Sequence, residues 1–236
     1  MNKKIIIGIV CALVIAIVCI GVYAFKTQNK NTSSVTKEPE EEVNVGDENT
    51  KVDSNGKKSL VVYFSLPEET GDAKEDSTVD VDGKTMGNTE YVANLIKDYT
   101  DADIYRIEPV KEYNTKDHQA LINDAKKEQE NDARPEIKTK ISNFDEYDII
   151  YVGYPIWWSD LPQIMYTFFE LYDFSGKTVI PFSTNGGSGL ASTVSTIKNK
   201  LTTANVEENA FALYRENMES APAKVESWLK ELGVVE

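Results

Sequence analysis

Histidine and cysteine are almost absent from this chain of 236 residues, and their scarcity excludes several kinds of active site. The only histidine is His118, which argues against a metal centre built from histidines and against a catalytic triad that relies on one. The two cysteines, Cys11 and Cys19, both lie within the first twenty residues. The rest of the chain therefore contains no disulfide, no thiolate metal site and no cysteine nucleophile, and we expect no metal.

Positive charge is also scarce. Lysine and arginine together number 25 against 39 aspartate and glutamate residues, which gives a net charge of −14. Proteins that bind nucleic acid need a surplus of basic residues to neutralise phosphates, so nucleic acid is not an expected partner. Hydrophobic residues make up 41% of the chain and charged residues 27%, values that exclude a wholly disordered or fibrous protein. The length fits one domain with appendages.

The most hydrophobic stretch lies at the start of the chain. Residues 5–25 form twenty-one positions without a charge, directly after Lys3 and Lys4. About 20 apolar residues are enough for a helix to cross a bilayer, where the backbone has no other hydrogen-bond partners. We therefore predict that residues 1–25 are a transmembrane anchor or a signal peptide.

Three interpretations of this segment remain open. An uncleaved anchor is the simplest. A cleaved signal peptide also fits, because the residues at 22–24 resemble the small-residue pattern of a cleavage site. A lipoprotein signal fits less well, because Val18 precedes Cys19 where such signals carry a small residue. A short basic leader before an apolar run is typical of exported proteins, so we expect the protein at the cell membrane, with its globular part outside the cytoplasm.

The composition changes again after residue 25. Residues 26–58 are rich in Lys, Glu, Asn, Thr, Ser and Asp and contain no aromatic residue. Such a segment cannot bury enough apolar surface to offset the entropy lost on ordering, so we predict a disordered polar linker. The folded domain is predicted to start near Ser59 and to occupy residues 59–236, a length that is ample for a single core.

Within this domain, hydrophobic runs alternate with helical patterns. The expected strands are 60–64, 102–109, 147–153, 177–182 and 205–213. The expected helices are 88–99, 118–131, 161–171, 188–201 and 221–232, and His118 on the polar second helix is expected to be solvated. This alternation predicts an α/β fold with a parallel sheet covered on both faces. In such sheets, ligands bind beyond the carboxyl ends of the strands, where the strand order reverses.

Polar residues with the properties of a phosphate site follow the first strand. Ser65 ends it, and after an insertion at 66–86 the residues Gly87, Asn88 and Thr89 open a helix, with Asn88 or Thr89 as its N-cap. Free backbone N–H groups and the helix dipole favour an anion at such a position. An ordinary helix cap is the alternative. The sequence has neither a Walker loop nor the dinucleotide pattern Gly-x-Gly-x-x-Gly at this position.

Two further loops follow the third and fourth strands. The first contains Pro155, Ile156, Trp157 and Trp158, and its prolines hold an aromatic face that suits a planar ligand. Alternatively, both tryptophans pack on the following helix. The second loop contains Thr184, Asn185, Gly186, Gly187 and Ser188. Its glycines allow the backbone to approach a flat ring, although a flexible turn would look the same. One ligand that reaches all three loops is the more economical interpretation.

These motifs resemble those of the flavodoxin family. The segments that carry the resemblance are 62–65, 87–89, 153–158, 173–177 and 185–189. The resemblance is strongest to the bacterial branch with a long first loop and a Pro-x-Trp-Trp second loop, and it covers residues 59–236. It implies a flavodoxin-like, doubly wound sheet of five parallel strands in the order 2-1-3-4-5, with helices on both faces, which binds FMN without a covalent bond.

The resemblance also implies roles for individual residues. Ser65, Asn88 and Thr89 would hold the FMN phosphate, next to Gly87. Pro155, Ile156, Trp157 and Trp158 would flank the isoalloxazine. Thr184, Asn185, Gly186, Gly187 and Ser188 would close its other side. The chain departs from the family where residues 66–86 split the usual compact phosphate loop. It departs again at Ser159, where relatives often carry a glycine that lets a peptide flip when the flavin is reduced. Serine tolerates the flipped backbone less well, so strong stabilisation of the semiquinone is not expected.

We expect from this an FMN protein that transfers electrons at the membrane surface to a redox partner protein or a small electron acceptor. Its acidic surface would dock a basic partner transiently. An acidic environment lowers the potential of the flavin, and Asp160, Glu170 and Asp173 would contribute if they face the ring.

Two alternatives remain open. The first is an FMN-dependent reductase of quinones that takes hydride from NAD(P)H, in which Tyr154, Trp157 or Tyr113 would line a substrate pocket. The second is a binding module that has kept the fold without a flavin.

Overall fold

The computed structural model describes residues 41–46, 52 and 56–236. The predicted anchor or signal peptide, 1–25, lies outside the described residues, as does the predicted linker up to residue 40. Within the described ranges, no helix is both long enough and apolar enough to cross a membrane.

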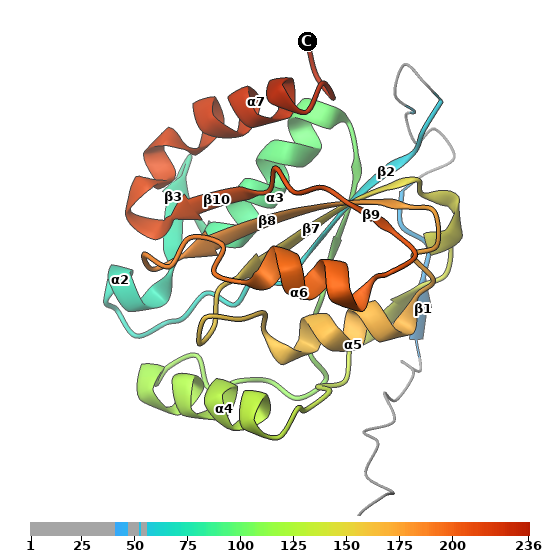
Figure 1. The fold of residues 1–236 in the computed structure, drawn as a ribbon. Helices are drawn as coiled ribbons and strands as arrows, with labels where there is room; N and C mark the ends of the chain where they lie inside the picture. Colours follow the sequence, from blue (N-terminus) through green and yellow to red (C-terminus); the bar gives the residue numbers. More distant parts are fainter. Residues whose placement is uncertain (1–40, 47–51, 53–55) are drawn as a thin grey trace, which may run out of the picture. The chain divides into compact units, whose positions relative to one another are not determined.

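A parallel sheet forms the centre of the domain (Figure 1). Its five main strands are β2 (Ser59–Tyr63), β5 (Asp103–Arg106), β7 (Ile149–Pro155), β8 (Thr178–Asn185) and β10 (Phe211–Tyr214). They lie side by side in the order β10-β8-β7-β2-β5, and every neighbouring pair is parallel. Numbered along the chain, this is the order 2-1-3-4-5, which confirms the predicted fold.

Each strand presents alternate residues to two separate cores. The helices of the domain are α2 (Ala73–Asp76), α3 (Asn88–Thr100), α4 (His118–Glu130), α5 (Gln163–Leu171), α6 (Thr193–Lys200) and α7 (Ala221–Glu231), with 3₁₀ turns η1 (Phe144–Glu146) and η2 (Arg215–Ser220). Val61 packs in one core with residues of α3 and α7, whereas Leu60 and Val62 pack in the other with residues of α5 and α6. Figure 1 shows these two helix pairs on opposite faces of the sheet. This period of two is the reason why the central strands β2 and β7 are largely apolar.

The insertion in the first loop is an ordered hairpin. Strands β3 (Thr78–Val81) and β4 (Lys84–Gly87) pair antiparallel and lead directly into α3. Asp82 and Gly83 form the turn with φ values of 52° and 78°, the conformation for which Asp-Gly is a preferred pair. The N-cap of α3 is Gly87, without a side-chain capping bond, so the prediction of Asn88 or Thr89 as the cap is wrong.

Part of the predicted linker belongs to the folded domain. Strand β1 (Glu41–Val43) pairs in parallel with β6 (Thr139–Ile141). Val45 is buried, and its backbone exchanges hydrogen bonds of 3.0 and 2.9 Å with the amide of Asn143. The Tyr147 hydroxyl donates to the Val45 carbonyl at 2.8 Å. The prediction of disorder is therefore wrong for residues 41–46, because side chains a hundred residues away satisfy this backbone.

Two predicted elements differ in extent from those observed. The expected strand 205–213 is divided into β9 (Asn205–Val206), which pairs with β8, and β10. Residues 207–210 separate the two pieces and include the polar Glu207, Glu208 and Asn209. The expected helix 188–201 begins as α6 only at Thr193, because the residues before it form turns.

Candidate functional site

A cavity of about 230 Å³ lies where β2, β7 and β8 end. Ten of the thirteen predicted site residues line it: Ser65, Asn88, Thr89, Pro155, Ile156, Trp157, Trp158, Thr184, Asn185 and Gly186. The other three, Gly87, Gly187 and Ser188, are not part of its lining. The carboxyl ends of adjacent parallel strands meet at one edge of the sheet, which is why loops so far apart in the sequence share one cavity.

The start of α3 forms one end of the cavity. A Cβ atom on Gly87 would lie 2.3 Å from the Ser65 Oγ, so only glycine allows the serine to sit against the helix start. The Thr89 and Thr184 hydroxyls are 2.7 Å apart and connect α3 to the end of β8. The Asn88 Oδ1 is buried and has no hydrogen-bond partner among the described residues. An unpaired buried polar atom is costly, and a ligand at this end of the cavity would relieve that cost.

Trp157 and Trp158 have different surroundings. The Trp157 ring packs edge-on against Phe64 and Tyr113, at centroid distances of 5.5 and 5.7 Å. The Trp158 side chain is 48% exposed, and its Nε1 donates to the Ile122 carbonyl of α4 at 2.9 Å. The alternative in which both rings pack on the following helix therefore does not describe Trp158, which is held to α4 and lines the cavity.

The turn that carries Trp158 is strained. The backbones of Trp157 and Asp160 exchange two hydrogen bonds of 2.9 Å. The residues between them, Trp158 and Ser159, have φ values of 48° and 62°, a left-handed conformation that costs side-chain-bearing residues about 1–2 kcal/mol each. Strain of this kind persists where the surroundings fix the backbone, which is common at binding sites.

Replacement of Ser159 by glycine is expected to stabilise the protein by about 0.5–1 kcal/mol, because glycine adopts this φ without steric cost. Urea denaturation measures the change. Gly176 has a φ of 75° with open space around it, so Gly176→Ala is the matched inverse and should destabilise by a similar amount. If Ser159→Gly lowers stability, the turn is not strained.

The third loop is organised by Asn185. Its Oδ1 accepts hydrogen bonds from the backbone N–H groups of Gly187 at 2.9 Å and Gly189 at 3.1 Å. Its Nδ2 donates to the Leu213 carbonyl of β10. These two N–H groups are therefore already hydrogen-bonded within the protein.

The cavity also contains residues that the sequence analysis did not assign to the site. They are Leu66, Glu68, Glu75 and Ser77 of the first loop, His118, Leu121, Ile122 and Ala125 of α4, and Arg215 after β10. One face of α4 thus forms a wall of the cavity. Its residues recur at helical spacing, a signal that equally indicates a core-facing helix. Arg215 gives no local signal, because only the pairing of β10 with β8 places it here.

His118 forms a hydrogen bond with Glu68 at the wall of this cavity. Its Nδ1 lies 2.9 Å from the Glu68 Oε2, and the Glu68 side chain is only 7% exposed. The His118 side chain is 33% exposed, so the expected contact with solvent is only partial and the bond to Glu68 comes in addition to it. Burial raises the pKa of the Glu68 carboxyl above its ordinary value of 4.5, and the hydrogen bond to His118 opposes part of that rise.

A carboxyl group with a raised pKa in the folded state binds its proton more tightly there than in the unfolded chain. The stability that it contributes is complete below pH 4.5 and is lost as the pH rises through the folded-state pKa. Glu68→Gln cannot titrate, so between pH 4.5 and 7 its melting temperature is expected to fall less than that of the wild type. Equal slopes in both proteins would contradict the raised pKa.

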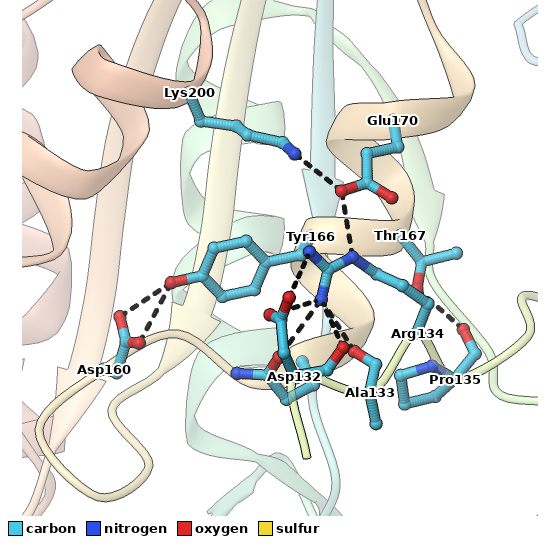
Figure 2. A network of polar contacts seen from close by, with 10 residues as sticks. Asp132, Ala133, Arg134, Pro135, Asp160, Tyr166, Thr167, Glu170 and Lys200 are labelled. Atoms are coloured by element: carbon cyan, nitrogen blue, oxygen red, sulfur yellow. Dashed lines mark hydrogen bonds and ion pairs between the residues drawn. The ribbon is translucent and has the colours of Figure 1, made fainter. Parts of the chain in front are cut away.

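Other carboxylates near the second loop are engaged away from the cavity. Figure 2 shows Arg134 between Asp132 and Glu170, with Lys200 also bound to Glu170. Asp160 accepts a hydrogen bond of 2.9 Å from the Tyr166 hydroxyl.

Asp173 accepts from the Ser175 N–H at 2.8 Å. Asp160, Glu170 and Asp173 therefore do not line the cavity, and its acidic residues are Glu68 and Glu75.

Several known proteins are similar to this domain. A candidate flavoprotein from Bacteroides eggerthii is 26% identical over 75% of this chain and 98% of its own, with a TM-score of 0.56. Another from Bacteroides uniformis is 28% identical over 72% of this chain and 98% of its own, with a TM-score of 0.55. A flavoprotein from Lactobacillus acidophilus, solved in complex with FMN, shares the fold at 19% identity over 73% of this chain and 98% of its own, with a TM-score of 0.52.

A comparison with curated proteins finds no match. A model of the flavodoxin family matches residues 82–232, well over half of the chain. Its match includes the strands and loops that build the cavity, apart from β2 and most of the first loop. Together with the strand order of the sheet, this match shows that the chain belongs to the flavodoxin family.

Proposed function

We propose that this domain binds FMN in the cavity and transfers electrons at the membrane surface. The observation that carries the proposal is the convergence of three loops on one cavity that contains buried polar atoms without partners, namely Asn88 Oδ1 and Arg215 Nε. A ligand with both an anionic end and a planar aromatic end would fit this lining. The structural relative from Lactobacillus acidophilus was solved with FMN, which supports the same ligand here.

The residues present fit FMN, which when bound supplies the transfer of one or two electrons. The hydroxyls of Ser65 and Thr89 donate to its phosphate, and the Asn88 amide donates when its NH₂ group faces the ligand. Trp158, held to α4, would provide an aromatic surface for the isoalloxazine, whereas Thr184 lies next to Thr89 at the phosphate end of the cavity. The apolar residues of α4 exclude water from this space.

The membrane location and the partner are further parts of the proposal. Residues 1–25 would anchor or export the chain, and the net charge of −14 favours a basic redox partner that docks weakly. Electron transfer of this kind needs no acid–base residue.

A second candidate function is the reduction of quinones with hydride from NAD(P)H. It is favoured by His118, because quinone reduction takes up protons and the His118–Glu68 pair lines the same cavity. Of the residues predicted to line a substrate pocket, Tyr154 is buried and donates to Thr193, so it is not available. Tyr113 lines two neighbouring cavities of about 420 and 230 Å³.

The experiment is an absorption spectrum of the full chain, purified in detergent, after addition of FMN and desalting. Retained flavin bands with quenched fluorescence support the proposal, and a colourless protein without affinity for FMN contradicts it. Oxidation of NADH in the presence of a quinone by the loaded protein then favours the second candidate. Reduction only by a protein donor, with no NADH oxidation, favours the electron carrier.

A further inference from the structure

Arg215 lies at the edge of the cavity, directly after β10. In the register between β10 and β8, Tyr214 pairs with Asn185, so that Arg215 stands beside Gly186 of the third loop. A Cβ atom built on Gly186 would be 3.6 Å from the Arg215 Cζ and 3.9 Å from its Nη1. The guanidinium therefore rests against the backbone of a loop that lines the cavity.

The Arg215 side chain has a buried donor without a partner. Its Nε is inaccessible to solvent and makes no hydrogen bond to any described residue. Among the described residues of the cavity lining, only Arg215 carries a permanent positive charge, whereas Glu68 and Glu75 are acidic. A buried guanidinium N–H is costly unless an acceptor satisfies it, and an anionic group on the ligand would supply that acceptor.

The usual donors for that anion are depleted in this chain. The insertion splits the phosphate loop, and the Asn88 N–H at the start of α3 donates to the Ser77 carbonyl at 2.9 Å. The N–H groups of Gly187 and Gly189 are bound to Asn185. The Arg215 guanidinium would replace part of the hydrogen bonding that free backbone N–H groups otherwise supply to an anion.

Arg215 is also on the side of the cavity where the phosphate is expected. The hydroxyl pair of Thr89 and Thr184 brings the start of α3 to the end of β8, and Gly186 is two residues further along. The guanidinium thus reaches the cavity next to the expected phosphate ligands. Arginine matches phosphate oxygens with two parallel N–H donors, a geometry that lysine and hydroxyl groups lack.

We propose that Arg215 binds the phosphate of FMN and makes the site selective for FMN over riboflavin. This inference rests on the proposed function, because it assigns a residue to that same ligand. It also predicts that the cavity binds inorganic phosphate in the absence of any flavin.

The test compares flavin affinities of the full-length wild type and Arg215→Gln by fluorescence quenching. The variant is expected to bind FMN about 10- to 100-fold more weakly, the range for loss of a charged hydrogen bond, and to bind riboflavin unchanged. Arg215→Lys should recover part of the FMN affinity. Equal weakening for both flavins would overturn the assignment to the phosphate, and unchanged FMN affinity would overturn any role in binding.

Lys198→Gln is the control for net charge. Lys198 pairs with Glu208 on the surface, so this substitution removes one positive charge, as Arg215→Gln does, but outside the cavity. A second measurement needs no flavin. At constant ionic strength, inorganic phosphate should raise the melting temperature of the wild type and of Lys198→Gln but not of Arg215→Gln. A phosphate effect that survives in Arg215→Gln would overturn the inference. Absence of FMN binding by the wild type, with the phosphate effect intact, would contradict only the proposed function.

Discussion

Alanine in place of Gly153 is expected to destabilise the protein by about 3 kcal/mol. Gly153 lies in β7 directly opposite Phe182 of β8. An added Cβ atom would stand 2.1 Å from the Phe182 Cζ and within 2.8 Å of two further ring atoms. The ring is fully buried in a packed core, so it cannot move aside without displacing its neighbours. Urea denaturation followed by circular dichroism measures the loss.

Two comparisons separate this clash from a general cost of alanine. Gly186→Ala places its methyl group at an ordinary contact distance of 3.6 Å from Arg215 and should change stability by less than about 1 kcal/mol. Phe182→Leu shortens the side chain that the new methyl group meets. The double variant Gly153→Ala/Phe182→Leu should therefore lose less free energy of unfolding than the sum of the losses in the two single variants. If Gly153→Ala unfolds at the same urea concentration as Gly186→Ala, the close packing of Phe182 on Gly153 is contradicted.

The sheet could be predicted because its strands are buried on both faces. Runs such as 60–64 and 149–152 are apolar at every position, and a parallel sheet covered by helices requires this. The strand order came from the resemblance to the flavodoxin family and is confirmed by the register of β2 between β5 and β7. The pattern of apolar residues thus predicted the strands and helices, and the resemblance to the flavodoxin family predicted the order of the strands in the sheet.

Elements with little hydrophobic signal were missed. Strand β1 consists of Glu41, Glu42 and Val43, and all three are exposed. It is ordered by hydrogen bonds to β6, which no local pattern reveals. The hairpin of β3 and β4 did have a signal, since Asp82-Gly83 lies between two short alternating segments.

The site was predictable only where it is local in sequence. Trp158 lies in the loop that follows β7 and Thr184 lies near the end of β8, so the topology of the sheet brings them together. His118 and Arg215 reach the same cavity through tertiary packing of α4 and β10. Their neighbours along the chain are polar, which equally describes an ordinary surface. Composition and residue spacing do not reveal which distant elements pack together, so these two residues could not be assigned to the site.

Removal of the Trp158 ring is expected to weaken FMN binding about 10- to 100-fold, because stacking of a planar ring on an aromatic side chain contributes about 1–3 kcal/mol. The ring is 48% exposed, makes one hydrogen bond to α4 and has the Lys126 Nζ 5.2 Å from its centroid, so Trp158→Ala should cost only about 1–2 kcal/mol of folding stability. Fluorescence titration gives the affinity, and urea denaturation gives the stability. Trp158→Phe retains an aromatic face and should keep much of the affinity.

Trp157→Ala is the matched comparison, because the adjacent ring has the opposite balance of contacts. Its edges pack against Phe64 and Tyr113, so its loss is expected to cost about 3 kcal/mol of stability. A stable Trp158→Ala protein that binds FMN as tightly as the wild type would contradict the stacking role of Trp158. Unchanged ligand content in both variants would favour a module that has kept the fold without a flavin. Weak binding by Trp158→Ala at near-normal stability would exclude that interpretation, because the loss would then arise at the ligand and not from the core.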